Sequence, residues 1–115
     1  MYSIDGTTIR LTRGDALVVQ LELTQDGEPY TPAEGDSIAF GLKSKLNASK
    51  TAFVDAEPLV EKAILTDDMT LRLAPADTKG LPFGNYAYDI EVTLASGQVD
   101  TVINNARFIL QPDVV

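Results

Sequence analysis

The chain contains no cysteine, no histidine and no tryptophan. The absence of cysteine excludes disulfide cross-links, thiolate catalysis and cysteine-ligated zinc. The absence of histidine removes the commonest general base, the commonest transition-metal ligand and the side chain that titrates nearest to neutral pH. We therefore expect no catalytic residues, no cofactor and no metal ligands, and we predict that the protein is not an enzyme.

Positive charge and long apolar runs are also scarce. The 115 residues carry nine Lys and Arg against seventeen Asp and Glu, a formal net charge of −8. This balance repels a phosphate backbone and no basic stripe offsets it, so nucleic acid is not an expected partner. No apolar run approaches the roughly 20 residues that span a bilayer, and the first residues lack the basic and apolar segments of a secretory signal. We expect neither a membrane partner nor secretion by a signal peptide.

Alternation of apolar and polar residues with a period of two dominates the sequence. It predicts strands over 16–24 and 86–94, and in the second of these Asp89 falls among the outward-facing residues. Shorter alternating stretches surround Ile9, Phe40 and Leu71, with turn residues between them. About seven short strands within one domain, residues 1–115, predict an all-β fold: an immunoglobulin-like antiparallel β-sandwich with two sheets.

Three segments need separate interpretation. Residues 59–65 fit a strand in either phase, and residues 75–80 are expected to form one helical turn. In the last strand, the apolar phase that ends at Ile103 conflicts with the phase that begins at Ala106. Either a β-bulge near residues 104–105 absorbs one residue, or Val102 points inward in place of Ile103.

The stretch GLPFG, residues 80–84, is predicted to carry the chain from one sheet to the other. Its glycines allow backbone angles that other residues avoid, its proline stiffens the corner, and one of its two large apolar side chains is expected to plug the open end of the core. A tyrosine hydroxyl at the start of the next strand is expected to bond back to this corner. The structural residues assigned to the corner are Gly80, Pro82, Gly84, Tyr86 and Tyr88.

Two surface motifs are candidate binding sites. The integrin-type tripeptide Arg13-Gly14-Asp15 lies on a connection of only a few residues, so we interpret Gly14 and Asp15 as turn residues. Lys43, Lys45 and Lys50 form a basic island with no acidic residue over 38–53. A protein partner is predicted to bind either an exposed strand edge or this loop, which would dock on an acidic partner surface. A merely solvated loop is the alternative interpretation of the basic island.

Aromatic residues bear on a possible sugar platform, which normally exposes coplanar rings with Trp preferred. Four of the eight Phe and Tyr residues occupy presumptive core positions. The remaining candidates for a platform are Tyr2, Tyr30, Phe53 and Phe83.

Several motifs carry a family resemblance: RGD at 13–15, DG with the following proline at 26–29, PADT at 75–78, LPFGNYAYD at 81–89 and FILQPD at 108–113. With them the chain resembles the immunoglobulin-like N-terminal domain of siphophage upper baseplate proteins and related small prophage tail proteins. The resemblance covers most of the chain, and its motifs are turns and strands rather than a chemical site.

The resemblance implies a noncatalytic structural and adaptor module of a phage or prophage tail baseplate that docks onto other tail proteins. It implies a location in the virion tail, or in the host cytoplasm during assembly, and it leaves a homo-oligomer open. Family members usually continue beyond the equivalent of 112–113, so a chain that stops at Val115 is either a stand-alone accessory protein or a truncated chain. The alternative function is a carbohydrate-binding or bacterial surface adhesion module, since the fold alone does not fix the function.

Overall fold

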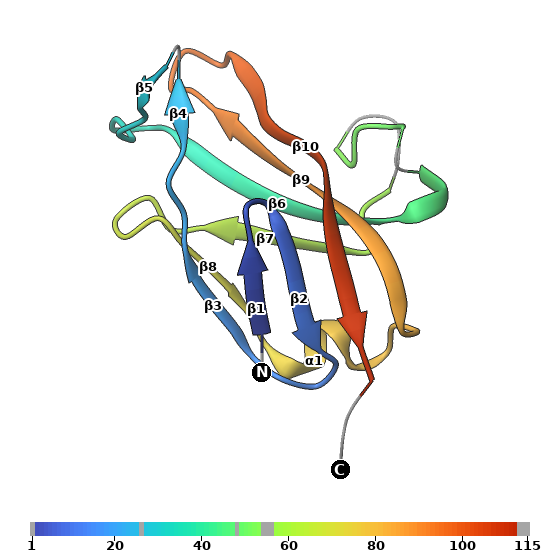
Figure 1. Cartoon of the computed structure of the whole chain (residues 1–115). Helices are drawn as coiled ribbons and strands as arrows, with labels where there is room; N and C mark the ends of the chain where they lie inside the picture. The colour runs from blue at the N-terminus through green and yellow to red at the C-terminus, as the bar shows by residue number, and fades with distance from the viewer. Residues whose placement is uncertain (1, 26, 48, 54–56, 113–115) are drawn as a thin grey trace.

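The computed structural model describes residues 2–25, 27–47, 49–53 and 57–112. These residues form an all-β, sandwich-like fold with one short helix (Figure 1). The elements in chain order are β1 (Tyr2–Asp5), β2 (Thr8–Thr12), β3 (Leu17–Gln20), β4 (Thr24–Gln25), β5 (Glu28–Pro29), β6 (Ser37–Ser44), the 3₁₀ turn η1 (Lys45–Asn47), β7 (Val60–Ile64), β8 (Thr70–Leu73), α1 (Pro75–Lys79), β9 (Gly84–Thr93) and β10 (Val99–Gln111).

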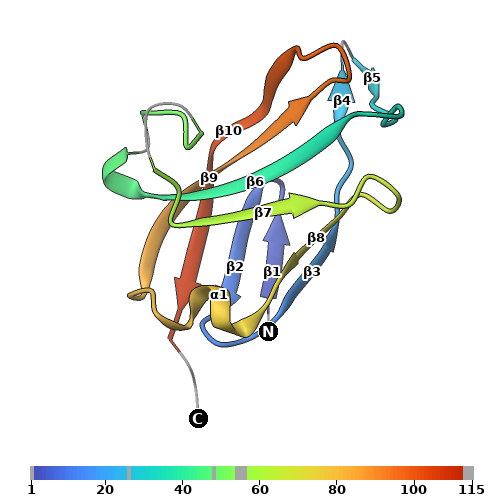
Figure 2. The same ribbon diagram turned by 180° about the vertical axis from the view of Figure 1, so that it is seen from behind.

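The strands form one large sheet and two small ones. The large sheet has the order β1-β2-β10-β9-β6-β7, and β3-β8 and β4-β5 form separate two-stranded sheets. The large sheet is strongly twisted, so that β7 is nearly horizontal in the picture while β1 and β2 are nearly vertical (Figure 1 and, from behind, Figure 2). The predicted all-β sandwich is confirmed.

The expectation of purely antiparallel sheets is wrong at one pair. Strand β10 runs parallel to β2, with Phe108 opposite Ile9 and Leu110 opposite Leu11. These two strands come from opposite ends of the chain, and no short hairpin connects them. Their relative direction is therefore set by the course of the whole chain and not by a local turn.

Aromatic residues from three neighbouring strands form the centre of the core. Phe40 in β6, Tyr88 in β9 and Phe108 in β10 are buried, with ring centroids 5.4 to 6.5 Å apart. Leucines from the β3–β8 pair are buried in the same cluster, so this cluster joins the two sheets. Burial of both Val60 and Ile64 settles the phase of β7, which the sequence left open.

The irregular part of β10 is the predicted bulge. Its pairing with β9 shifts register between Thr101 and Ile103 and again between Ile103 and Ala106. Asn105 has a φ of +56°, and Ile103 packs against the core while Val102 is exposed. The alternative in which Val102 points inward is wrong.

The segment 80–84 leads from β8 and α1 into β9, and so crosses from the small sheet to the large one. The Tyr86 hydroxyl donates a hydrogen bond to the carbonyl of Pro82 at 2.6 Å, and Gly84 has a φ of +142° that favours glycine. Gly80 has a φ of −88°, which any residue adopts, so the expectation that it needs a glycine's freedom is wrong.

The two large apolar side chains of the crossing segment, Leu81 and Phe83, differ in burial. Leu81 packs against the core, while Phe83 is 46% exposed, so Leu81 is the apolar side chain that closes this end. The Tyr88 hydroxyl donates a hydrogen bond across the fold to the carbonyl of Thr7 at 2.5 Å. Burial raises the pKa of Tyr88 to about 12, because the charged phenolate is disfavoured away from water.

Core substitutions test these strand phases. Ile90→Ala is expected to lower the free energy of unfolding by about 2–5 kcal/mol, because the side chain is fully buried and its removal leaves a cavity. Leu21→Ala is expected to cost less, because Leu21 lies beyond the end of β3 and is only partly buried. Urea denaturation followed by far-UV circular dichroism measures both changes. A loss below about 1 kcal/mol for Ile90→Ala would contradict the assigned phase.

Candidate functional site

A buried ion pair lies on the outer face of the large sheet, where the sequence predicted solvent. Asp89 in β9 and Lys43 in β6 have side chains that are both 0% exposed, and Lys43 Nζ lies 3.1 Å from Asp89 Oδ2. The expectation that Lys43 belongs to an exposed docking loop is therefore wrong. A charged pair buried at this depth needs close geometry and further hydrogen bonds to offset its lost hydration.

Backbone amides supply those further hydrogen bonds. Asp89 Oδ2 accepts a hydrogen bond from the amide of Ala52 at 2.7 Å, and Oδ1 accepts one from the amide of Asn105 at 2.8 Å. Lys43 Nζ also donates to the carbonyl of Lys50. One carboxylate thus connects β6, β9, the bulge of β10 and the loop that follows η1.

This loop packs directly on the sheet. Ala52 is fully buried, and a Cβ atom added to Gly41 in β6 would lie 2.9 Å from the Phe53 ring and 3.1 Å from the Ala52 side chain. Glycine at position 41 therefore permits the close approach of loop and strand. The loop covers the outer face at β6, which excludes water from the Lys43–Asp89 pair.

Next to this anchor the chain exposes a basic and apolar surface, the basic turn, made of Lys45, Leu46 and Lys50. All three side chains are exposed, Leu46 at 95%. Among the described residues, neither Lys45 nor Lys50 forms an ion pair with an acidic side chain. Lys45 and Arg107 also line a neighbouring hollow of about 250 Å³ on the outer side of β9 and β10. Of the predicted docking residues, the structure thus leaves Lys45 and Lys50 at the surface.

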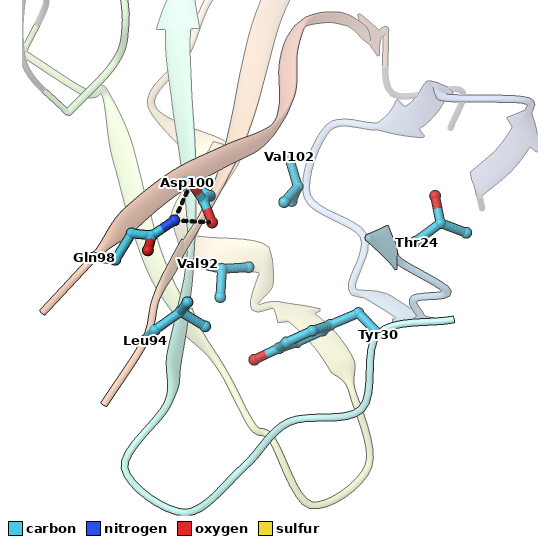
Figure 3. A pocket seen from close by; sticks show the side chains of 7 residues that line it. All are labelled: Thr24, Tyr30, Val92, Leu94, Gln98, Asp100 and Val102. Atoms are coloured by element: carbon cyan, nitrogen blue, oxygen red, sulfur yellow. Dashed lines mark hydrogen bonds between the residues drawn. The ribbon is translucent and has the colours of Figure 1, made fainter. Parts of the chain in front are cut away.

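At the other end of β6 lies a groove of about 320 Å³ (Figure 3). Its apolar lining comes from the β9–β10 hairpin and its surroundings, namely Val92, Leu94 and Val102. Gln98 Nε2 donates to the Asp100 carboxylate at 3.4 Å, and in Figure 3 Val92 and Leu94 lie between this pair and Tyr30. A second hollow of about 530 Å³ shares Tyr30 and Leu94 and adds Glu28 and Asp36. No basic residue is among those lining the two hollows, which we together call the acidic groove.

Asp36 holds the shape of the acidic groove. Its Oδ2 accepts hydrogen bonds from the Tyr30 hydroxyl at 2.7 Å and the Ala33 amide at 2.9 Å, and its Oδ1 accepts one from the Ala95 amide at 3.0 Å. The Ala33 amide first, and then the Tyr30 hydroxyl and the Ala95 amide, lower the pKa of Asp36. Burial and the neighbouring Asp36 raise the pKa of Tyr30 to about 12.

The tripeptide at 13–15 forms a turn that lies against the corner before β9. Gly14 has a φ of +88°, and the Asp15 amide donates to the Thr12 carbonyl at 3.0 Å. The Arg13 guanidinium lies 4.0 Å from the centroid of the Phe83 ring and donates to the Leu81 carbonyl at 3.3 Å. Arg13 is thus held by intramolecular contacts, which argues against its use as a free integrin ligand.

The candidate platform aromatics are dispersed in the structure. Tyr30 lines the acidic groove, Phe53 packs over Gly41, and Phe83 lies beneath Arg13. The Tyr2 side chain lies outside the described residues. Three rings with three separate sets of neighbours do not form a shared coplanar surface.

Neither a metal site, nor a membrane-spanning helix, nor a similarity to a known protein assigns a function to the described residues. In the described part of the chain, no group of three or more Asp or Glu residues could hold a metal ion. Within the same residues, no helix is long and apolar enough to cross a bilayer. No family model, no curated protein and no solved structure matches the chain.

Sequence reasoning missed Asp89 and Asp36, although one signal for Asp89 was present. Gly41 and Lys43 occupy the outward phase of β6, and Ala87 and Asp89 occupy the outward phase of β9. Small residues next to opposite charges on two adjacent strands indicate a face that another segment covers. For Asp36 two of the three donors, Tyr30 and Ala33, lie in the same β5–β6 connection as Asp36. The third donor, the Ala95 amide, follows β9, and no local pattern in the sequence indicates that contact.

The buried pair predicts unequal effects on stability. Asp89→Ala should lower the free energy of unfolding by about 3–5 kcal/mol, because it leaves the Lys43 ammonium buried without its counter-charge. Lys43→Met should cost less, because Asp89 keeps its two amide donors. Urea denaturation at pH 7 compares the two variants. An equal or larger loss for Lys43→Met would show that Asp89 is not the organising group.

Asp36 predicts a dependence of stability on pH. Because its folded-state pKa lies below the ordinary value of 3.8, its contribution to stability is present above that value and is lost as the pH falls through the lower folded pKa. Asp36→Asn should therefore be less stable than the native chain at pH 7, and this difference should shrink on acidification below about pH 4. Urea denaturation over a pH series measures it.

The control is Asp67→Asn, at an exposed aspartate in the turn between β7 and β8. This substitution should leave the free energy of unfolding nearly unchanged throughout the pH series. A difference between Asp36→Asn and the native chain that stays constant with pH would contradict the role given to the Asp36 carboxylate.

Proposed function

We propose that the chain is a noncatalytic protein–protein docking module that serves as a structural adaptor of a phage or prophage tail baseplate. The observation that carries the docking function is the basic turn. It presents Leu46 at 95% exposure between two exposed lysines, beside a loop anchored on the buried Asp89.

Anchoring matters because binding costs conformational entropy. A turn that is already held by the Lys43–Asp89 pair and by the packing of Ala52 loses less freedom when a partner binds. An exposed leucine can fill a partner's apolar pocket, while Lys45 and Lys50 select a surface that carries acidic groups. The partner's expected chemistry is therefore an apolar pocket with an acidic rim.

The tail assignment is supported by the resemblance of the motifs at 13–15, 75–78, 81–89 and 108–113 to the siphophage baseplate family. The motifs at 13–15 and 81–89 meet in the structure, where Arg13 contacts Leu81 and Phe83. The partners we propose are other tail and baseplate proteins, in the virion or in the host cytoplasm during assembly.

A carbohydrate-binding function is the second candidate. The acidic groove favours it, because a tyrosine ring, a carboxylate and an amide side chain line one hollow. Such groups can stack on a sugar ring and bond its hydroxyls.

A pair of leucine variants tests the docking function. Leu46→Asp should weaken binding to purified tail proteins encoded beside this chain by at least about tenfold, which corresponds to about 1.4 kcal/mol. Leu65→Asp is the matched control, since Leu65 is also exposed, at 56%, but lies beside the β7–β8 turn. Surface plasmon resonance measures both affinities.

A glycan array run in parallel separates the two candidate functions. Saturable binding to one glycan, with no tail protein bound, would favour the carbohydrate-binding function. Unchanged tail-protein affinity in Leu46→Asp would remove the basic turn from the docking surface.

A further inference from the structure

The two exposed surfaces described above lie at opposite ends of one strand. Asp36, which shapes the acidic groove, immediately precedes β6, and Lys45 in the basic turn immediately follows it. An eight-residue strand is roughly 26 Å long at about 3.3 Å per residue. The groove and the turn are therefore too far apart to meet within one copy, as the positions of the β4–β5 hairpin and η1 in Figures 1 and 2 also show.

The chemistry of the two surfaces is complementary. The acidic groove offers an apolar lining, and Asp100 lies in the same hollow of about 320 Å³. No basic residue lines the groove. The basic turn offers one exposed leucine next to a lysine, and Arg107 lies beside that lysine in the neighbouring hollow. Leu46 matches the apolar lining, and Lys45 and Arg107 match the carboxylates.

We propose that the basic turn of one copy binds in the acidic groove of a second copy, so that the chain assembles head to tail. The proposal rests on the docking role given to the basic turn and names a partner for it. Two different surfaces form this contact, so each copy in a dimer keeps one surface free for a further copy. Such a contact builds a ring if the rotation between copies closes, and an open filament if it does not.

The net charge of −8 opposes association at long range. At physiological ionic strength the screening length is about 8 Å, which is well below the length of β6. Repulsion between distant acidic residues is therefore screened more strongly than local pairing of the basic turn with the acidic groove. A partner protein with a similar lysine–leucine segment is the main competing occupant of the groove.

Two complementary variants test the head-to-tail contact. The turn variant carries Lys45→Gln and Leu46→Ser and keeps the groove, whereas the groove variant carries Asp100→Lys and Val102→Lys and keeps the turn. Sedimentation velocity over a concentration series should show the native chain associating beyond a dimer. Each variant alone should remain monomeric.

An equimolar mixture of the two variants is the decisive sample. The intact turn of the groove variant can bind the intact groove of the turn variant, so the mixture should reach twice the monomer mass and no more. A symmetric contact that uses one surface twice predicts no such restoration. Thermal unfolding of each variant verifies the fold, and the milder variants Leu46→Ser and Asp100→Asn repeat the test with smaller changes.

The proposal is overturned if the native chain stays monomeric at every concentration, if either variant alone still associates, or if the mixture stays monomeric. Failure of the head-to-tail contact can be distinguished from failure of the proposed function. Tail-protein binding that Leu46→Asp abolishes, in a chain that never self-associates, would retain the docking role and remove the second copy as partner. Self-association without tail-protein binding would retain the head-to-tail contact and remove the tail assignment.

Discussion

The Asp89 carboxylate is the group on which the outer half of the structure depends. It is fully buried on a sheet face that alternation assigns to solvent, and there it accepts hydrogen bonds from Lys43, Ala52 and Asn105. Removing a charge from water costs several kcal/mol unless such partners replace the lost hydration. The loop, the bulge and β6 must therefore take up one specific arrangement around it, and this requirement gives the loop a defined place on the sheet.

A second carboxylate, that of Asp36, also organises neighbouring loops by accepting hydrogen bonds, at the opposite end of β6. The Asp36 carboxylate accepts hydrogen bonds from the Tyr30 hydroxyl and from the amides of Ala33 and Ala95. It thereby joins the β5–β6 connection to the loop that follows β9. The pairing of strands determines the frame, but these two carboxylates determine the shape of its ends. Both surfaces that we propose for binding lie beside one of them, which is consistent with binding surfaces that need little reorganisation.

The two ends differ in charge and shape, and this difference gives the domain a direction. A leucine with flanking lysines projects at one end, and a hollow lined by apolar and acidic residues lies at the other. The adaptor role that we propose needs at least two binding surfaces, and the proposed head-to-tail contact would let copies add in sequence.

The sequence by itself determined the local features. Alternation located the strands around Phe40 and Ile90, turn residues located the crossing at 80–84, and the conflict of phases located the bulge in β10. These features depend on neighbours along the chain, so a local pattern carries them. Only the tertiary structure decided the parallel pairing of β2 with β10 and the burial of Lys43 with Asp89, which lies 46 residues away. Such contacts depend on which segments meet in space, and no periodicity within one strand records that.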